Sequence, residues 1–358
     1  MALTVEAVQT ALKGLIDPNT QIDFVSAKSV KNLRVDGGDI SLDIVLGYPA
    51  KSQFDSIRKL VINAVRELPG VKNVSVNVSS QIVAHAVQRG VKLLPNVKNI
   101  IAIASGKGGV GKSTTAVNLA LALAAEGAQV GILDADIYGP SQHIMFGVRG
   151  ERPMMKDDGT GKGWIVPIEK FGIKMMSIGL LIDEKQAVVW RGPMVSSAIR
   201  QFVSDVDWGE LDYLLIDLPP GTSDIHLTLV QLIKLTGAVI VTTPQKVALS
   251  DATKGLQFFN QSGINVPLLG LVENMAYFTP AELPDNKYYL FGKDGGKTLA
   301  EKYKVPFLGE VPLIQAIREA GDEGKPIAAD VGPSADAFMH IAENLAQQIA
   351  ITNAKISA

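Results

Sequence analysis

The chain has 358 residues, of which 47% are hydrophobic and 20% are charged, and it contains no cysteine. This length and composition predict a globular protein with two domains and a sizeable core. A formal net charge of −2 lacks the basic excess that nucleic-acid binding usually requires. The missing cysteines exclude disulfides, thiolate catalysis and thiolate-bound clusters within this chain.

The beginning of the chain shows no export signal, because no basic region precedes a long apolar one. Nowhere does an apolar run approach the roughly 20 residues of a membrane span. We therefore expect a cytoplasmic protein that binds neither membrane nor nucleic acid.

Residues 1–80 have the pattern of a small α+β domain, and residues 81–98 are expected to link it to the rest, with helical spacing over 81–94. A hairpin turn is predicted at Asp36-Gly37-Gly38. The other elements expected in this domain are helices at 4–15 and 54–68 and strands at 22–25, 39–46 and 71–78.

From residue 99 to residue 358, strand and helix patterns alternate, which predicts a doubly wound, mostly parallel α/β sheet. Ligands bind such sheets beyond the carboxyl ends of the strands. The expected strands are 100–105, 130–133, 213–217, 238–242, 268–273 and 308–311.

A glycine-rich segment follows the first of these strands and reads Gly-Lys-Gly-Gly-Val-Gly-Lys-Ser-Thr over residues 106–114. It fits the phosphate-binding loop of nucleotide-binding proteins, whose backbone N–H groups wrap the phosphates. The alternative is a plain glycine-rich turn between strand and helix. The residues expected to bind ATP here are Gly106, Lys107, Gly108, Gly109, Val110, Gly111, Lys112, Ser113 and Thr114.

Lys107 is a second lysine that an ordinary phosphate-binding loop does not need. It is typical of the deviant Walker A ATPases, whose members dimerise around nucleotide and whose extra lysine reaches the partner's nucleotide. The resemblance implies a homodimer with Lys107 and Lys112 as catalytic residues, Lys107 stabilising charge as an arginine finger does. The alternative for Lys107 is a solvated lysine on an exposed loop.

Three aspartates end predicted strands. We expect Asp136 to orient the attacking water and Asp134 to support the metal shell, with capping of a turn or helix as the alternative for both. Asp217 ends an apolar strand as a Walker B residue does, so that we expect Ser113 to bind Mg²⁺ directly and Asp217 to hold it through a water molecule.

Two later residues are expected at the adenine base. Asn274 ends a strand, and its amide offers both a donor and an acceptor to the edge of the base. Pro312 follows the last strand and is expected to pack on the other side of the base.

The motifs together resemble the Mrp/ApbC branch of the deviant Walker A ATPases, which are nucleotide-binding iron–sulfur cluster carriers. The first 80 residues are similar to the small PaaD/SufT-like domain often fused ahead of them. The resemblance implies slow ATP hydrolysis and partners among iron–sulfur assembly proteins or apo-protein clients. It rests on residues 106–115, 134–141, 189–194, 217–224, 242–245 and 273–275.

The chain departs from this family where cluster ligands are expected. A Cys-x-x-Cys pair follows the Glu-Asn-Met motif in the family, but here Pro280 and Leu283 stand near those positions. Glu282 and Asp285 lie beside them, and their hard oxygen atoms replace thiolate poorly. The family's iron–sulfur cluster is therefore implied by the resemblance and unsupported by these residues.

Two functions other than iron–sulfur cluster assembly are compatible with the motifs. One is a MinD/ParA-like switch, which would recruit a partner when nucleotide binds and would carry no cluster. The other is an ATP-dependent small-molecule transferase similar to dethiobiotin synthetase, for which the sequence shows no substrate pocket.

Overall fold

The computed structural model describes most of the chain, in two compact units. The first comprises Met1–Val83, Ala125–Gly127 and Ala346–Ala358, and the second Ala84–Ala124 and Ala128–Leu345. The described residues are 3–85, 94, 96–157, 159, 161, 163–181, 192–222, 224–280, 282–330 and 332–357. Most of the helix predicted over 81–94 lies outside them, and residues 81–85 form no helix.

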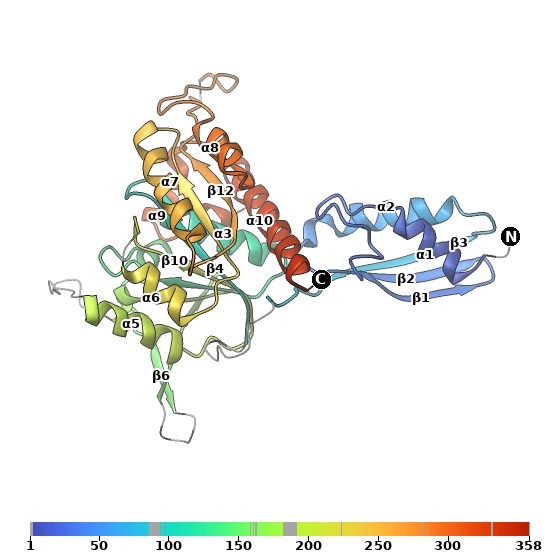
Figure 1. Ribbon diagram of the computed structural model, residues 1–358, viewed down its shortest axis with the longest axis horizontal. Helices are drawn as coiled ribbons and strands as arrows, with labels where there is room; N and C mark the ends of the chain where they lie inside the picture. Colours follow the sequence, from blue (N-terminus) through green and yellow to red (C-terminus); the bar gives the residue numbers. More distant parts are fainter. Residues whose placement is uncertain are drawn as a thin grey trace. The chain divides into compact units, whose positions relative to one another are not determined.

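The first unit contains a three-stranded sheet in the order β1-β2-β3 (Figure 1). β2 alternates buried and more exposed residues, as a strand with one covered face does. It pairs antiparallel with β1 and parallel with β3, and α2 makes the crossover between β2 and β3. The elements are α1 (Val5–Lys13), β1 (Val30–Asp36), β2 (Asp39–Leu46), η1 (Lys51–Gln53), α2 (Phe54–Arg66) and β3 (Asn73–Ser80).

The hairpin turn at residues 37–38 is confirmed, and Gly37 has the positive φ of +58° that such a turn requires. The strand predicted at 22–25 is wrong, because that segment forms turns with one isolated bridge at Asp23. β1 was not predicted, since a register shift between Lys31 and Arg34 interrupts its pairing and its alternation.

The second unit contains an eight-stranded sheet in the order β13-β12-β11-β4-β10-β5-β9-β8, parallel except for the edge strand β8. Its central strands are buried on both faces and read as continuous apolar runs. The doubly wound fold and the six expected strands are confirmed. The strands are β4 (Val97–Ser105), β5 (Val130–Asp134), β8 (Ile168–Lys170), β9 (Ile173–Ser177), β10 (Leu211–Asp217), β11 (Gly237–Thr242), β12 (Leu268–Asn274) and β13 (Phe307–Val311).

Helices cover this sheet, with α7 and α8 against β12 (Figure 1). A separate hairpin, β6 (Met154–Asp157) and β7 (Gly163–Val166), was not predicted. In the described part of the chain, no helix has both the length and the apolar character needed to cross a membrane. The helices are α3 (Lys112–Ala125), α4 (Gln142–Met145), η2 (Ile178–Leu180), α5 (Gly192–Ser204), α6 (Asp224–Leu232), α7 (Lys246–Asn260), α8 (Gly295–Tyr303), α9 (Gln315–Asp322), η3 (Ile327–Ala329) and α10 (Pro333–Ser357).

Candidate nucleotide-binding site

The glycine-rich segment 106–111 lies between the carboxyl end of β4 and the start of α3. β4 is the central strand at which the order of the sheet reverses, with β10 on one side and β11 on the other. Open sheets of this kind bind ligands at such a point. Because the first N–H groups of α3 have no partner within the helix, the loop and the helix together favour an anion.

The glycines of this loop serve different purposes. At Gly106 a Cβ atom would lie 2.1 Å from the backbone carbon of Asp251 in α7, so only glycine allows this packing. At Gly111 a Cβ atom would lie 2.0 Å from the amide nitrogen of Asn274, and φ is +84°. Gly109 has a φ of +80° in open space, and Gly108 meets nothing closer than 3.9 Å.

We expect Gly106→Ala to destabilise the protein by about 3 kcal/mol, because the added methyl group overlaps backbone that cannot rotate away. Gly108→Ala is the matched control in the same loop. It should change the free energy of unfolding by no more than about 0.5 kcal/mol. Urea unfolding of both variants measures the difference, and equal stabilities would contradict the packing argument.

A buried cluster of charge lies at the end of this loop. The ammonium group of Lys112, with 6% of its side chain exposed, lies 2.6 Å from Oδ1 of Asp217 and 3.2 Å from Oγ of Ser113. Oδ2 of Asp136 is 3.7 Å from the same nitrogen. Four predicted site residues therefore meet at one point.

Asp136 is largely buried in this cluster. Burial raises the pKa of its carboxyl group, and the charge of Lys112 opposes that rise. A raised pKa makes a carboxylate a better acceptor for the proton of a water molecule.

The expected support of the metal shell by Asp134 stays a prediction. The carboxylate of Asp134 accepts hydrogen bonds from the backbone N–H groups of residues 136, 141 and 142 and from the hydroxyl of Ser177. Burial and the nearby charge of Asp217 raise the pKa of Asp134 to about 7. Its side chain holds the loop after β5 and the start of α4, as the capping alternative anticipated.

Lys107 lines the same loop cavity and is partly exposed. Among the described residues, no ion pair is found for its ammonium group. This arrangement leaves the charge of Lys107 available to a ligand or to another chain.

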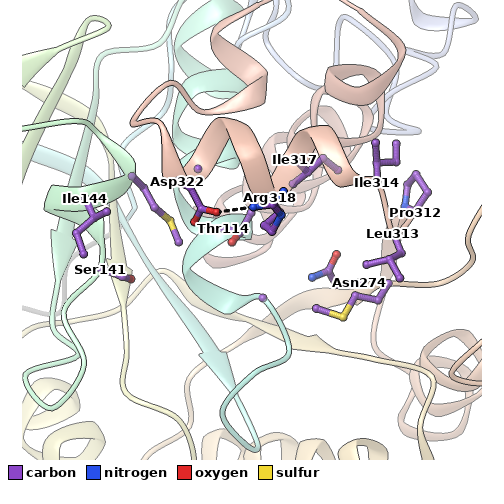
Figure 2. Close-up of a pocket in the computed structure, with 14 residues that line it drawn as sticks. Thr114, Ser141, Ile144, Asn274, Pro312, Leu313, Ile314, Ile317, Arg318 and Asp322 are labelled. Atoms are coloured by element: carbon purple, nitrogen blue, oxygen red, sulfur yellow. Dashed lines mark hydrogen bonds and ion pairs between the residues drawn. The ribbon is translucent and has the colours of Figure 1, made fainter.

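Two adjoining cavities surround the start of α3. The first, of about 220 Å³, is lined by the phosphate-binding loop together with Asp136 and Pro220. The second, of about 360 Å³, is largely apolar (Figure 2). They share the lining residues Gly111, Thr114, Ser141 and Met145. Their combination of a polar end with an apolar end matches a nucleoside phosphate.

Asn274 and Pro312, both predicted at the base, line the larger cavity. Figure 2 shows them on one side of it, with Ser141 and Ile144 on the other. The amide nitrogen of Asn274 donates a hydrogen bond of 2.8 Å to the carbonyl of Val110. Because a carbonyl only accepts, this bond leaves the oxygen of the Asn274 amide, an acceptor, for a ligand.

Gln142 belongs to the site and was not identified from the sequence. It is fully buried at the start of α4, and its side-chain nitrogen donates to Oδ2 of Asp217 (2.9 Å) and to the carbonyl of Ser113 (3.0 Å). No signal in the sequence distinguishes this glutamine from an ordinary helix residue.

Pro280 and Leu283, which stand near the positions of the family's cysteine pair, are joined by a backbone hydrogen bond. The N–H of Leu283 donates to the carbonyl of Pro280 (3.1 Å), and Phe278 pairs with Tyr288. Leu283 exposes 48% of its surface and offers no metal ligand. Among the described residues, no three histidines, aspartates or glutamates are placed to hold a metal ion. Of the segment 189–194, on which the resemblance also rests, residues 189–191 lie outside the described residues, among them Trp190 and Arg191.

Two family models match the chain. One, described as NUBPL iron-transfer P-loop NTPase, covers residues 96–346, and the other, described as iron–sulfur cluster assembly protein, covers residues 5–78.

Individual proteins match over most of the chain. An iron–sulfur cluster carrier protein of Synechocystis sp. is 46% identical over 98% of this chain and 99% of its own length. One from Pseudomonas fragi is 50% identical over 82% of this chain and 98% of its own length. A solved nucleotide-binding protein from Archaeoglobus fulgidus, in complex with ADP, is 39% identical with a TM-score of 0.59 and covers 69% of this chain and 94% of that one.

Proposed function

Because this chain belongs to the family of NUBPL iron-transfer P-loop NTPases, we propose that it binds and slowly hydrolyses ATP as a homodimer in iron–sulfur cluster assembly in the cytoplasm. The observation that carries the proposal is the convergence of Lys112, Ser113 and Asp217 at a glycine loop whose cavity continues into an apolar one.

ATP would place its phosphates along residues 106–114. Lys112 would exchange part of its contact with Asp217 for the phosphates, and the N–H groups at the start of α3 would bind their oxygen atoms. Asp136 would orient the water that attacks the γ-phosphate, and Lys107 of the second subunit would stabilise the charge that develops.

The residues present suit Mg²⁺. Ser113 offers a hydroxyl oxygen and Asp217 a carboxylate, and both contact the same ammonium group of Lys112. Mg²⁺ prefers such hard oxygen ligands and commonly uses one or two of them alongside phosphate and water. When bound, it would neutralise charge on the phosphates.

The cluster itself is cargo for which this chain supplies no thiolate, since it has no cysteine. We propose that assembly partners or apo-protein clients provide the sulfur ligands. The alternative, a nucleotide-gated switch that recruits a partner and carries no cluster, is favoured only by the same absence of cysteine.

The base is proposed to be adenine, because the Asn274 amide keeps its oxygen and one N–H bond after bonding to Val110, and a donor beside an acceptor suits the edge of adenine. We expect Asn274→Ala to weaken ATP binding about tenfold, the equivalent of about 1.4 kcal/mol. GTP binding should change less, so that the preference for ATP falls.

Asn344→Ala is the matched control, because the amide of Asn344 also donates to a backbone carbonyl, that of Leu308 at 2.8 Å, away from both cavities. Competition titrations with ATP and GTP measure the preference. If the Asn274 variant prefers ATP over GTP as strongly as the wild type does, Asn274 does not contact the base.

The proposal as a whole is tested by measuring Mg²⁺-dependent phosphate release and the mass of the protein in solution with and without ATP. Hydrolysis accompanied by a doubling of mass supports it. Absence of nucleotide binding would overturn it.

A further inference from the structure

Gln142 contacts the residues expected at the metal without being one of its expected ligands. Its side-chain nitrogen bridges Oδ2 of Asp217 at 2.9 Å and the carbonyl of Ser113 at 3.0 Å. These two partners belong to β10 and α3, so one amide joins the two elements that carry the expected metal ligands.

The orientation of this amide is fixed by chemistry. A backbone carbonyl only accepts, and the carboxylate of Asp217 is already paired with Lys112 at 2.6 Å, so the nitrogen must face both partners. Both N–H bonds of the amide are then used. The amide oxygen of Gln142 is buried and has no hydrogen-bond partner among the described residues.

The backbone of Gln142 is held in place by the carboxylate of Asp134. Oδ2 of Asp134 accepts from the backbone N–H of Gln142 at 3.1 Å, from that of Ser141 at 3.0 Å and from the hydroxyl of Ser177 at 2.8 Å. Asp134 and Gln142 are both fully buried. A continuous chain of hydrogen bonds therefore runs from Asp134 through α4 to Asp217.

The two oxygens of Asp217 have different partners. Oδ2 is held by Gln142, whereas Oδ1 pairs with the ammonium group of Lys112, which also contacts the hydroxyl of Ser113. If Gln142 did not hold Oδ2, the carboxylate would be free to turn both oxygens toward Lys112. That ion pair would then compete with the metal and the phosphates for the same two groups.

We propose that Gln142 is a positioning residue that holds the Asp217 carboxylate with Oδ1 presented to Mg²⁺. Partners of this kind, one step removed from the metal, commonly change metal affinity by about 10–100-fold when removed. The inference rests on the proposed function, because it concerns the Mg²⁺ that accompanies the nucleotide.

The test measures how strongly Mg²⁺ and nucleotide binding are coupled. A nonhydrolysable ATP analogue is titrated into the full chain with excess Mg²⁺ and again with EDTA, and the ratio of the two affinities is taken. In Gln142→Met, which keeps the volume and removes both donors, we expect this ratio to fall about tenfold. The affinity in EDTA should change by less than about threefold.

Asn118→Leu is the matched control. Asn118 is also a buried amide in this unit, and it bonds to the carbonyl of Thr114 and to the N–H of Ala328, without touching Asp217. This variant should lose stability but keep the affinity ratio. If Gln142→Met does not fold, Gln142→Asn replaces it, since its amide falls one carbon–carbon bond, about 1.5 Å, short of Asp217.

The outcomes separate the two proposals. A wild-type chain that binds no nucleotide overturns the proposed function. A wild-type chain whose binding is coupled to Mg²⁺, together with an unchanged ratio in the Gln142 variants, overturns only this inference. A lowered ratio in those variants and an unchanged ratio in the Asn118 control support it.

Discussion

Replacing Lys112 with alanine is expected to abolish measurable ATP hydrolysis and to weaken ATP binding by at least about 100-fold, which corresponds to about 2.7 kcal/mol. Lys112 supplies the one cation that contacts Asp136, Asp217 and Ser113 together within the described part of the chain. Its loss also leaves the fully buried Asp217 without its charge partner. We expect the free energy of unfolding to fall by about 3 kcal/mol.

A double variant separates these two effects. Lys112→Ala combined with Asp217→Asn removes the unpaired charge, and we expect it to recover most of the stability and none of the nucleotide binding. Urea unfolding and equilibrium titration with ATP measure the two quantities. Retained hydrolysis in the single variant would contradict the assignment of the phosphate site.

Lys107→Ala is expected to leave ATP affinity within about twofold and to slow hydrolysis by at least about 100-fold, toward the range known for a lost arginine finger. The reason is that Lys107 is partly exposed, has no ion-pair partner in the described structure and lines the loop cavity. ATP-dependent dimerisation should weaken as well. Lys156→Ala, at an exposed lysine of the β6–β7 hairpin, is the control.

Mixing two inactive variants tests whether Lys107 acts across the dimer. In a mixed dimer, the Lys107→Ala subunit keeps its own Lys112 and receives Lys107 from the Lys112→Ala subunit. Each mixed dimer should therefore have one complete site and about half the rate of a wild-type dimer, with the amount of mixed dimer measured from the mass of the mixture in ATP. If mixed dimers form and stay inactive, Lys107 does not act in trans.

The architecture of the larger unit could be predicted because its central strands are buried on both faces and read as apolar runs, most of which end in a polar residue. The loop at 106–114 was recognised from its residue pattern, in which four glycines stand beside a lysine and a serine, and its binding of phosphate stays a prediction. The pattern did not show that Gly106 and Gly111 are also required by contacts with Asp251 and Asn274.

What could not be predicted depends on contacts between distant segments. β1 was missed because its register shift breaks the two-residue alternation, and β9 because its short apolar run lies beside no chemical motif. Gln142 was missed because its importance comes from Asp217, 75 residues away in the chain. The capping role of Asp134 depends on Ser177 in the same way, since β9 pairs with β5 only in the folded sheet.

The chain follows its family in the phosphate-binding loop and departs from it near the family's cysteine pair, where Pro280 and Leu283 stand. It has no thiolate there, and no group of metal ligands is found among the described residues. We infer that nucleotide turnover and cluster ligation can be measured independently in this protein.

We infer that this chain runs the ATP cycle of its family while the cluster ligands come from elsewhere. The most direct test is anaerobic reconstitution of the purified chain with iron and sulfide, counting bound iron and acid-labile sulfide alongside ATP hydrolysis. We predict Mg²⁺-dependent hydrolysis with far less than one cluster bound per dimer. A stable, stoichiometric cluster on the chain alone would show that its own residues hold the cluster and would contradict this inference.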